Sequence, residues 1–313
     1  MSININELVT TTLRDRNSKI ADNVTNHNAF LSRLKQKGNM KTAEGRVITE
    51  PLIYAENGTF KWYDGFETWN IAAEEVVDAA EFNWKLGGGF FYLTGEEKIK
   101  NRGDAAAIDL VEARTLSTEA TMKNQVATSV YSDGTGSSSK EIGGLQLLID
   151  DDPTSAGTVG GIDQVANTFW RNQFSAAAAT TSANIRDRFN DMWLATLRGI
   201  DKTDMILCDN AMYRYYEDAL QANVRYTDTK SADAGFEMLK YKSADVTYDD
   251  QCPANHAYFL NTDYLCMRYA AGRKFQVGKE REIQNGDYSI WPFLFAGNLT
   301  CSNRARQGVI IAS

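Results

Sequence analysis

The sequence contains few of the residues on which most enzyme chemistry depends. Its 313 residues include only two histidines, His27 and His256, and neither stands near a serine or cysteine nucleophile motif. Acid–base catalysis therefore has no evident candidate. The four cysteines, Cys208, Cys252, Cys266 and Cys301, show no Cys-x-x-Cys spacing. We expect reduced thiols rather than a disulfide framework or a thiolate metal cluster.

The chain also has fewer basic residues than acidic ones. Lys and Arg number 33 against 41 Asp and Glu, which gives a formal net charge of -8 and a pI near 5.0. A protein that coats nucleic acid needs clustered cations, so this class is excluded. No apolar run approaches the roughly 18 residues of a membrane span, and the start lacks a basic segment followed by an apolar one. The sequence therefore predicts a soluble, cytoplasmic protein that does not bind a membrane.

The motifs that suggest catalysis or ligand binding are weak. Ser137 and Lys140 have the Ser-x-x-Lys spacing of serine acylases but follow a glycine-rich loop, and no Lys-Thr-Gly accompanies them. Cys252, His256 and Cys266 lack a short chelating pair and an evident fourth ligand. We predict no catalytic residue, no cofactor and no metal site. Should the chain be an enzyme, its nearest carboxylates are Asp209, Asp249 and Asp250.

The N-terminal segment, residues 1–44, has helical periodicity. Its apolar positions form two stripes, broken near Asn17 and ended by Gly38: Ile5, Leu8, Val9 and Leu13, then Ile20, Val24, Leu31 and Leu34. We interpret it as an amphipathic arm joined to the first strand by a flexible segment, residues 37–40. Such a stripe must be buried, either in the core of its own subunit or against a neighbour.

An aromatic segment follows the arm. Residues 47–54 and 59–63 are rich in Val, Ile, Tyr, Phe and Trp, and Asn57-Gly58 between them predicts a type I′ hairpin turn. A cluster of Trp62, Tyr63, Phe66 and Trp69 comes next. Aromatic residues on a long excursion belong either to the core or to an anchor for a second subunit. A strand is predicted from 81 to 86.

Thr94 and Glu97 have the spacing of a capping box, which predicts that a long helix begins here. Apolar residues continue the helix to about Tyr131, and Gly103 is its weak interior position. Asp133-Gly134 should end it. At about 1.5 Å per residue this helix reaches on the order of 50 Å, more than a compact domain of this size needs.

The remaining sequence alternates between strands and helices, as in a mixed α/β domain. A strand, 145–149, is followed by a helix, 181–198, and by the buried strand 205–208. Asp209 is expected to cap a helix over 211–222. Further strands are predicted at 245–248, 257–260, 275–277, 288–296 and 308–312.

Several blocks, taken in order, resemble the major capsid proteins of tailed bacteriophages, which have the Hong Kong 97-type fold. The blocks run from Thr94-Gly-Glu-Glu97 and Tyr131-Ser-Asp-Gly134 through Ile142-Gly-Gly-Leu-Gln146, Gly157-Thr-Val-Gly-Gly-Ile-Asp163 and Phe169-Trp-Arg-Asn-Gln173 to Asp249-Asp-Gln-Cys-Pro253, Tyr258-Phe-Leu-Asn-Thr262 and Gly297-Asn-Leu-Thr-Cys-Ser-Asn-Arg304. No block is specific by itself. Their order and spacing carry the resemblance.

The resemblance implies a division of the chain. Residues 1–44 become the N-arm, 54–84 the E-loop, 85–140 with 279–313 the P-domain, whose spine is the long helix, and 141–278 the A-domain. Asp133, Gly134 and Gly136 become a hinge between the spine and the A-domain. Contacts between subunits are expected at Ile5, Leu8, Leu13, Val24, Leu31, Trp62, Tyr63, Phe66 and Trp69.

The resemblance also implies a function. The chain would be the major capsid protein of a tailed phage, self-assembling into hexamers and pentamers of an icosahedral shell in the cytoplasm of the host bacterium. The shell would enclose double-stranded DNA without sequence-specific binding, and its other partners would be portal, scaffolding and decoration proteins. The alternatives are an encapsulin-like compartment shell and an α/β enzyme with its site in the A-domain.

Overall fold

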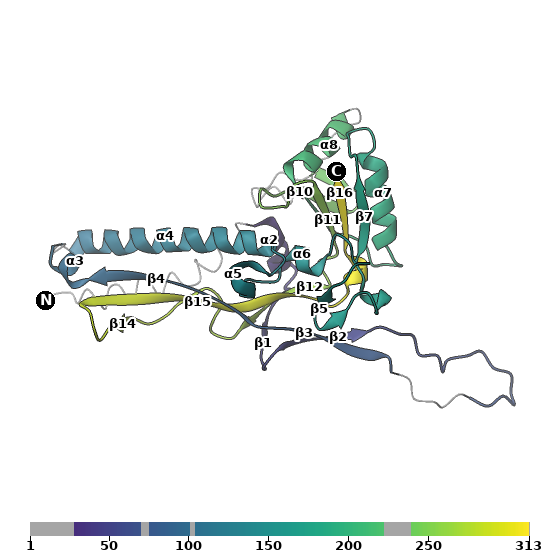
Figure 1. Ribbon diagram of the computed structural model, residues 1–313, viewed down its shortest axis with the longest axis horizontal. Helices are drawn as coiled ribbons and strands as arrows, with labels where there is room; N and C mark the ends of the chain where they lie inside the picture. The colour runs from purple at the N-terminus through teal and green to yellow at the C-terminus, as the bar shows by residue number, and fades with distance from the viewer. Residues whose placement is uncertain (1–27, 70–74, 101–103, 222–238, 313) are drawn as a thin grey trace.

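The computed structural model describes residues 28–69, 75–100, 104–221 and 239–312. The molecule is elongated, with a long helix lying over a sheet at one end (Figure 1). A second sheet with two helices stands at the middle of the molecule, and a thin ribbon extends from the other end. Among the described residues no helix is long and apolar enough to cross a membrane.

The first sheet is built on one long antiparallel pair, β4 (Lys85–Thr94) and β15 (Tyr288–Cys301). β15 also pairs with β12 (Leu265–Ala270), β13 (Gln276–Val277) and β14 (Arg281–Glu282), and β12 pairs in parallel with β1 (Met40–Ala43). Helix α4 (Asp104–Val130) lies along one face, where Phe91, Leu93, Trp291 and Phe293 form a small core under it.

The capping box is confirmed. The Thr94 hydroxyl accepts a hydrogen bond from the Glu97 amide at 3.3 Å, and a Glu97 carboxylate oxygen accepts one from the Thr94 amide at 3.1 Å. Helix α3 (Gly95–Lys100) begins at this cap, and α4 follows it. Gly103, the predicted weak position, lies outside the described residues. The long helix ends at Val130, one residue before the predicted end.

The second sheet has the strand order β7-β16-β11-β8-β10-β9. Its strands are β7 (Gln173–Ala178), β8 (Met205–Cys208), β9 (Leu239–Tyr241), β10 (Ala244–Tyr248), β11 (His256–Leu260) and β16 (Gly308–Ala312). Helices α7 (Ile185–Thr196) and α8 (Asn210–Gln221) cover one face. The predicted cap of α8 is confirmed, because an Asp209 carboxylate oxygen accepts a hydrogen bond from the Met212 amide at 2.8 Å.

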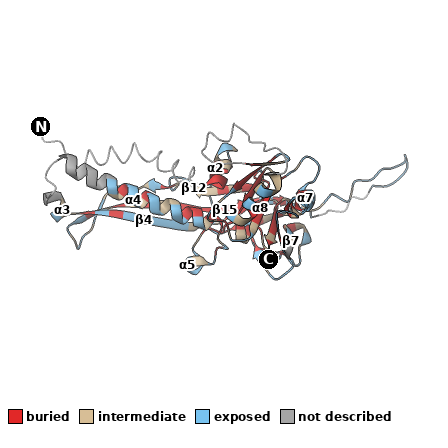
Figure 2. Ribbon diagram, turned by 90° about the horizontal axis from the view of Figure 1, so that it is seen from above, coloured by how far each residue is buried: buried red, intermediate tan, exposed pale blue. Residues whose placement is uncertain are grey.

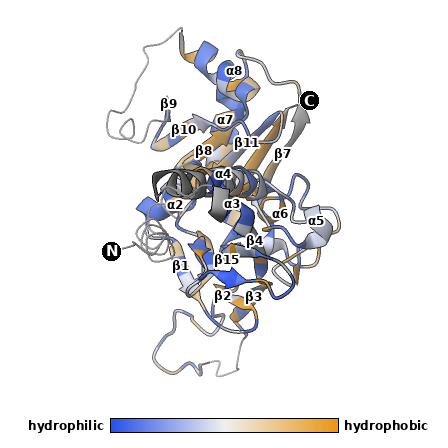
Figure 3. Ribbon diagram, turned by 90° about the vertical axis from the view of Figure 1, so that its left-hand side faces the viewer, coloured by the Kyte–Doolittle hydropathy of each residue, from blue (hydrophilic) through white to orange (hydrophobic). Residues whose placement is uncertain are grey.

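The second sheet contributes to two cores because successive side chains of a strand point to opposite faces. In β8, Ile206 and Cys208 pack with α7 and α8, whereas Met205 and Leu207 pack with residues of the first sheet and the end of α4. β8 and β11, at the middle of this sheet, are among the hydrophobic strands of the molecule (Figure 3). The larger core therefore joins the two sheets into one body.

Several short elements connect the longer ones. They are α2 (Ala29–Gln36), α5 (Gly136–Ser139), α6 (Leu145–Leu148), the β5–β6 hairpin (Thr158–Val159 and Ile162–Asp163), and the 3₁₀ turns η1 (Thr168–Trp170) and η3 (Arg304–Arg306). The projecting ribbon consists of β2 (Ile48–Ile53) and β3 (Val77–Phe82), which pair only with each other among the described residues.

The prediction of a strand at 145–149 is wrong, because this segment forms helix α6. Its buried residues, Leu145, Leu148 and Ile149, have the i, i+3, i+4 spacing of a helical face. The amides of Leu148 and Ile149 donate to the carbonyls of Gly144 and Leu145. A run of five residues was too short for its periodicity to be distinguished from that of a buried strand.

The predicted hairpin at Asn57-Gly58 is also wrong. Residues 59–63 form no strand, and β2 instead pairs with β3 in the register Ile48↔Phe82 to Ile53↔Val77. The Asn57 side chain accepts hydrogen bonds from the amide and hydroxyl of Thr59, which makes a local turn. The predicted strand 81–86 is divided at Asn83 and Trp84 between β3 and β4.

The strand pairing differs from the predicted domain division at two places. The last strand, β16, was grouped with the long helix but lies between β7 and β11 in the second sheet. Conversely, β12 and β13 fall within the predicted A-domain segment, 141–278, but pair with β15 in the first sheet. The chain crosses between the sheets through η3, which a reading along the sequence cannot reveal.

Candidate assembly surfaces

A group of exposed aromatic residues lies on residues 54–69, here called the aromatic loop. It contains Phe60, Trp62, Tyr63, Phe66 and Trp69, and every one of them is exposed. Trp62 is 90% exposed and Phe66 is as exposed as in an extended peptide, at 107%. Figure 2 shows the loop as a pale blue extension beyond the buried centre of the molecule. A soluble monomer rarely presents so many aromatic side chains together, so this loop is a candidate interaction surface.

The aromatic loop has some internal order. The Phe60 and Trp62 rings are in edge contact with centroids 5.8 Å apart, and those of Tyr63 and Trp69 are 5.3 Å apart. Lys61 pairs with Glu67 at 2.8 Å. These contacts hold the side chains in pairs but cover little of their surface, so most of the apolar area remains available.

A groove of about 620 Å³ lies between α4 and β4. Gly87 and Gly89 of β4 have no side chains to fill it, and Thr118 and Met122 of α4 with Phe295 of β15 complete its walls. Leu86, Phe90 and Tyr92 of β4 are exposed. Strand β4 therefore has exposed apolar side chains next to this groove.

Helix α2 is bound to its own subunit. Its buried residues include Phe30, Leu31 and Leu34, all in the larger core. Leu31 was predicted to contact a neighbouring subunit, and this is wrong because its side chain is 1% exposed. Ile5, Leu8, Leu13 and Val24 lie outside the described residues, so their interface role stays a prediction.

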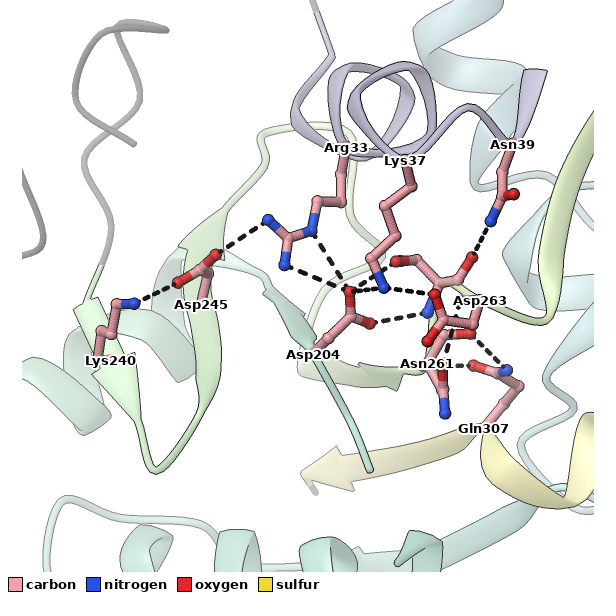
Figure 4. Close-up of polar contacts among 10 residues, drawn as sticks. Arg33, Lys37, Asn39, Asp204, Lys240, Asp245, Asn261, Asp263 and Gln307 are labelled. Carbon is pink, nitrogen blue, oxygen red and sulfur yellow. Dashed lines mark hydrogen bonds and ion pairs between the residues drawn. The ribbon is translucent and has the colours of Figure 1, made fainter. Parts of the chain in front are cut away.

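Ion pairs fix the polar face of α2 (Figure 4). Asp204 lies 2.9 Å from the Lys37 ammonium and 3.4 Å from the Arg33 guanidinium, and it accepts hydrogen bonds from the hydroxyl and amide of Thr262. Arg33 also approaches Asp245 at 3.5 Å. Although burial alone would raise it, the pKa of Asp204 is lowered by the Lys37 and Thr262 hydrogen bonds.

The segment 37–40 is not the flexible connection that the sequence suggested. Gly38 has φ +71°. The Gly38 amide donates a hydrogen bond to the Lys35 carbonyl, and the Asn39 amide donates one to the Leu34 carbonyl. These two hydrogen bonds form a Schellman cap at the end of α2. The buried Asn39 side chain donates to the Thr262 carbonyl at 2.7 Å. This segment therefore anchors α2 to β1.

The predicted hinge forms a tight, ordered turn. Gly134 has φ +78°, and a Cβ at this position would lie 3.2 Å from the Gly143 Cα. Asp133 accepts hydrogen bonds from the amide and hydroxyl of Thr135, and these hydrogen bonds lower its pKa. Gly136 begins α5, whose residues Ser137 to Ser139 have left-handed φ values. The need for glycine at 134 is confirmed, whereas motion at this turn stays a prediction.

Three side chains that the sequence offered as candidate ligands or catalytic groups make structural contacts. His256 pairs with Asp151 at 3.0 Å, and Asp209 accepts from the Asn255 amide as well as capping α8. Asp249 accepts from the Tyr131 hydroxyl and the Asn28 side chain, both at 2.8 Å. No group of three His, Cys, Asp or Glu residues in the described part of the chain is placed to hold a metal ion.

Solved structures with the same architecture are shells. The chain resembles the cyanophage A-1(L) capsid subunit, with a TM-score of 0.62, 15% identity, and coverage of 88% of this chain and 90% of that one. It resembles the capsid subunit of Myoviridae phage XM1, with a TM-score of 0.55, 12% identity, and coverage of 90% and 92%. The SrpI encapsulin of Synechococcus elongatus PCC 7942 is similar at a TM-score of 0.54, 9% identity, and coverage of 89% and 86%. The fold is that of the Hong Kong 97-type capsid proteins.

A match to a family model identifies the family within this fold class. The family model of the SU10 major capsid protein matches residues 108–311, so the chain belongs to the SU10 major capsid protein family. It is a phage capsid shell protein. No curated protein matches the sequence. Family membership therefore comes from the family model, and the solved structures establish the fold.

Proposed function

We propose that this subunit assembles into hexamers and pentamers that close an icosahedral head around double-stranded DNA. The exposed aromatic loop is the observation that carries the proposal. Ring closure needs one patch on each subunit to meet a different patch on the next, and the loop is a projecting apolar patch of this kind. The acidic composition suits a wall that encloses DNA rather than one that binds its phosphates.

The regions are assigned with the strand pairing taken into account. The N-arm comprises residues 1–44, with α2 as its anchor, and the E-loop comprises residues 54–84, with the β2–β3 ribbon as its stem. The P-domain comprises α4 and the first sheet, and the A-domain comprises the second sheet with α7, α8 and β16. Trp62, Tyr63, Phe66 and Trp69 contact the adjacent subunit, and Ile5, Leu8, Leu13 and Val24 form a second contact.

The head is assembled in the cytoplasm of the host bacterium, with portal, scaffolding and decoration proteins as partners. The subunit itself performs no catalysis, because the carboxylates and the histidine of the A-domain are held in structural contacts. An encapsulin-like compartment remains the second candidate, since its fold is shared. The contents of purified particles distinguish the two, as a phage head contains DNA and a compartment contains protein cargo.

Removal of loop aromatics tests the proposal. Trp69→Ala and Phe66→Ala should leave the melting temperature of the isolated subunit unchanged, because both side chains are exposed within it. Each loses apolar area buried between subunits at roughly 25 cal/mol per Å², so closed shells should be strongly reduced in sedimentation and electron microscopy. Lys61→Ala, in the same loop, is the matched control. Normal shell yield from the aromatic variants would refute the anchor.

A further inference from the structure

We propose that the β5–β6 hairpin is a buttress that sets the direction of the β2–β3 ribbon and therefore of the aromatic loop. The inference rests on the proposed function, because the direction of the loop matters only if the loop contacts another subunit. β5 lies at the base of the ribbon, where the ribbon leaves the body of the molecule (Figure 1). Nothing else in the described residues pairs with either strand of the ribbon through β-bridges.

The contact is made by the two-residue turn of the hairpin. Gly160 and Gly161 both have positive φ, +63° and +79°, as a two-residue hairpin turn requires. The Gly160 carbonyl accepts a hydrogen bond from the Glu81 amide of β3 at 2.8 Å. A Cβ on Gly160 would lie 2.9 Å from the Ala80 Cβ and 3.2 Å from Phe82 Cζ. The turn therefore touches the ribbon so closely that only glycine fits.

The hairpin is fixed in position by its contacts with the core. Val159 and Ile162 are buried, and the Val159 carbonyl accepts a hydrogen bond from the Trp170 indole at 2.9 Å. Gln164, directly after β6, accepts two hydrogen bonds from the buried Arg304 guanidinium at 3.0 and 3.1 Å. Because the hairpin is fixed to the core and also contacts the ribbon, the base of the ribbon is fixed relative to the core.

The ribbon acts as a lever on this support. Its stem residues Ala80 and Phe82 are buried, whereas Ile53 and Val77, at its outer end, are 84% and 62% exposed. Beyond them the aromatic loop extends into solvent. A small rotation at the base therefore moves the aromatic side chains by a much larger distance. Misdirected loops would change the angle between adjacent subunits and hence the curvature of the shell.

The paired glycines provide a matched test. Gly160→Ala and Gly161→Ala place an alanine at similarly strained positive φ, so both lose comparable stability. Only Gly160→Ala adds an atom that collides with the ribbon, because a Cβ on Gly161 would have no atom within 4 Å. We expect Gly160→Ala to yield about tenfold fewer closed shells than Gly161→Ala, with a broader range of diameters, since each defect is repeated around the particle.

Two further measurements complete the experiment. Ala80→Gly removes the nearer of the two atoms that Gly160→Ala meets, so the double variant should move toward the shell diameters of Gly161→Ala. Hydrogen exchange of the unassembled full chain should be faster at residues 79–82 in Gly160→Ala than in Gly161→Ala. Equal shells and equal exchange in the two single variants would overturn the buttress. If the unaltered chain forms no shell, the proposed function fails. The exchange measurement still tests whether the hairpin supports the ribbon.

Discussion

Arg304 shows how one residue organises this subunit. Its side chain is fully buried, yet its partners are uncharged: the carbonyls of Leu148 and Trp170 and the side chains of Gln164 and Asn172. Burial lowers the pKa of the guanidinium to about 10, so the group remains charged at neutral pH. The buried guanidinium charge is tolerated because its N–H groups donate hydrogen bonds to these acceptors. It connects α6, the β5–β6 hairpin, η1 and the turn before β16.

The Glu97–Arg114 pair gives a prediction for acid conditions. The Arg114 side chain donates to Glu97, and together with the Thr94 amide it lowers the pKa of the Glu97 carboxyl from 4.5 to about 2. A carboxyl with a depressed folded-state pKa stabilises the fold above its unfolded pKa. This contribution should therefore be complete above about pH 4.5 and be lost as the pH falls toward 2.

Urea denaturation of the unassembled subunit across this range checks the prediction. Glu97→Gln should lower the free energy of unfolding at neutral pH and flatten its dependence on pH between about 4.5 and 2. Glu44→Gln, at an exposed position, is the control and should leave that dependence unchanged. An identical pH profile for Glu97→Gln and the unaltered chain would contradict the assignment.

Residue-scale features were predictable where they depend on near neighbours. The caps at Thr94 and Asp209 and the glycine at 134 follow from spacing within three residues, and the structure confirms them. The role of Arg304 was not foreseen, because its partners lie at least 132 positions away in the sequence. Nor did the pattern Gly160-Gly161 indicate that the turn touches Ala80, since that contact exists only after the chain has folded.

At the scale of elements, α2 determines what the N-terminal residues can do. A deletion of residues 1–27 retains the Asn28 side chain that caps α2, and the melting temperature of the subunit should change little. A deletion of residues 1–36 also removes Phe30, Leu31 and Leu34 from the core, each of which contributes roughly 2–5 kcal/mol. It should lower the melting temperature by more than about 10 °C.

Circular dichroism melts of the two truncated chains measure the difference. The shorter deletion is itself the control for the longer one, and sedimentation of the shorter one reports whether the arm contributes to shells. Equal melting temperatures for both deletions would show that α2 is not part of the subunit core. Helix α2 begins at Ala29 after its Asn28 cap, a boundary that periodicity did not predict because the apolar pattern of the sequence runs across it.

Long elements were predicted better than short ones. The long helix α4 and the helix around Phe189 each bury several residues in a regular pattern over their described part, and both are present. α6 and the aromatic loop were mistaken because five or six residues contain too little periodicity. Asn57-Gly58 favours a tight turn, but a hairpin also needs a second strand that can bury one face, and Phe60, Trp62 and Tyr63 are exposed in the described structure.

At the scale of the whole molecule, the two sheets share a core. Leu207 and Tyr258 of the second sheet pack in the same cluster as Leu265 and Phe295 of the first. The predicted division near residue 140 is therefore crossed by continuous packing. We expect the unassembled subunit to unfold in a single calorimetric transition, without separate melting of the A-domain.

Two core substitutions test this cooperativity. Leu207→Ala opens the shared core and Ile206→Ala opens the core under α7 and α8, and each should cost roughly 2–5 kcal/mol. Both should move the one transition to lower temperature. A variant that produces a second, earlier transition would show that the sheets unfold independently.

The position of β16 has a consequence for synthesis of the protein in the cell. This strand, from 308 to 312, is inserted between β7 and β11, which are translated much earlier. The second sheet consequently stays open, with two unpaired strand edges, until the ribosome has made residues 308–312. Unpaired strand edges can pair with other chains, so the newly made subunit should be most prone to aggregation before residues 308–312 complete this sheet. Any factor that protects the newly made subunit should bind those two edges.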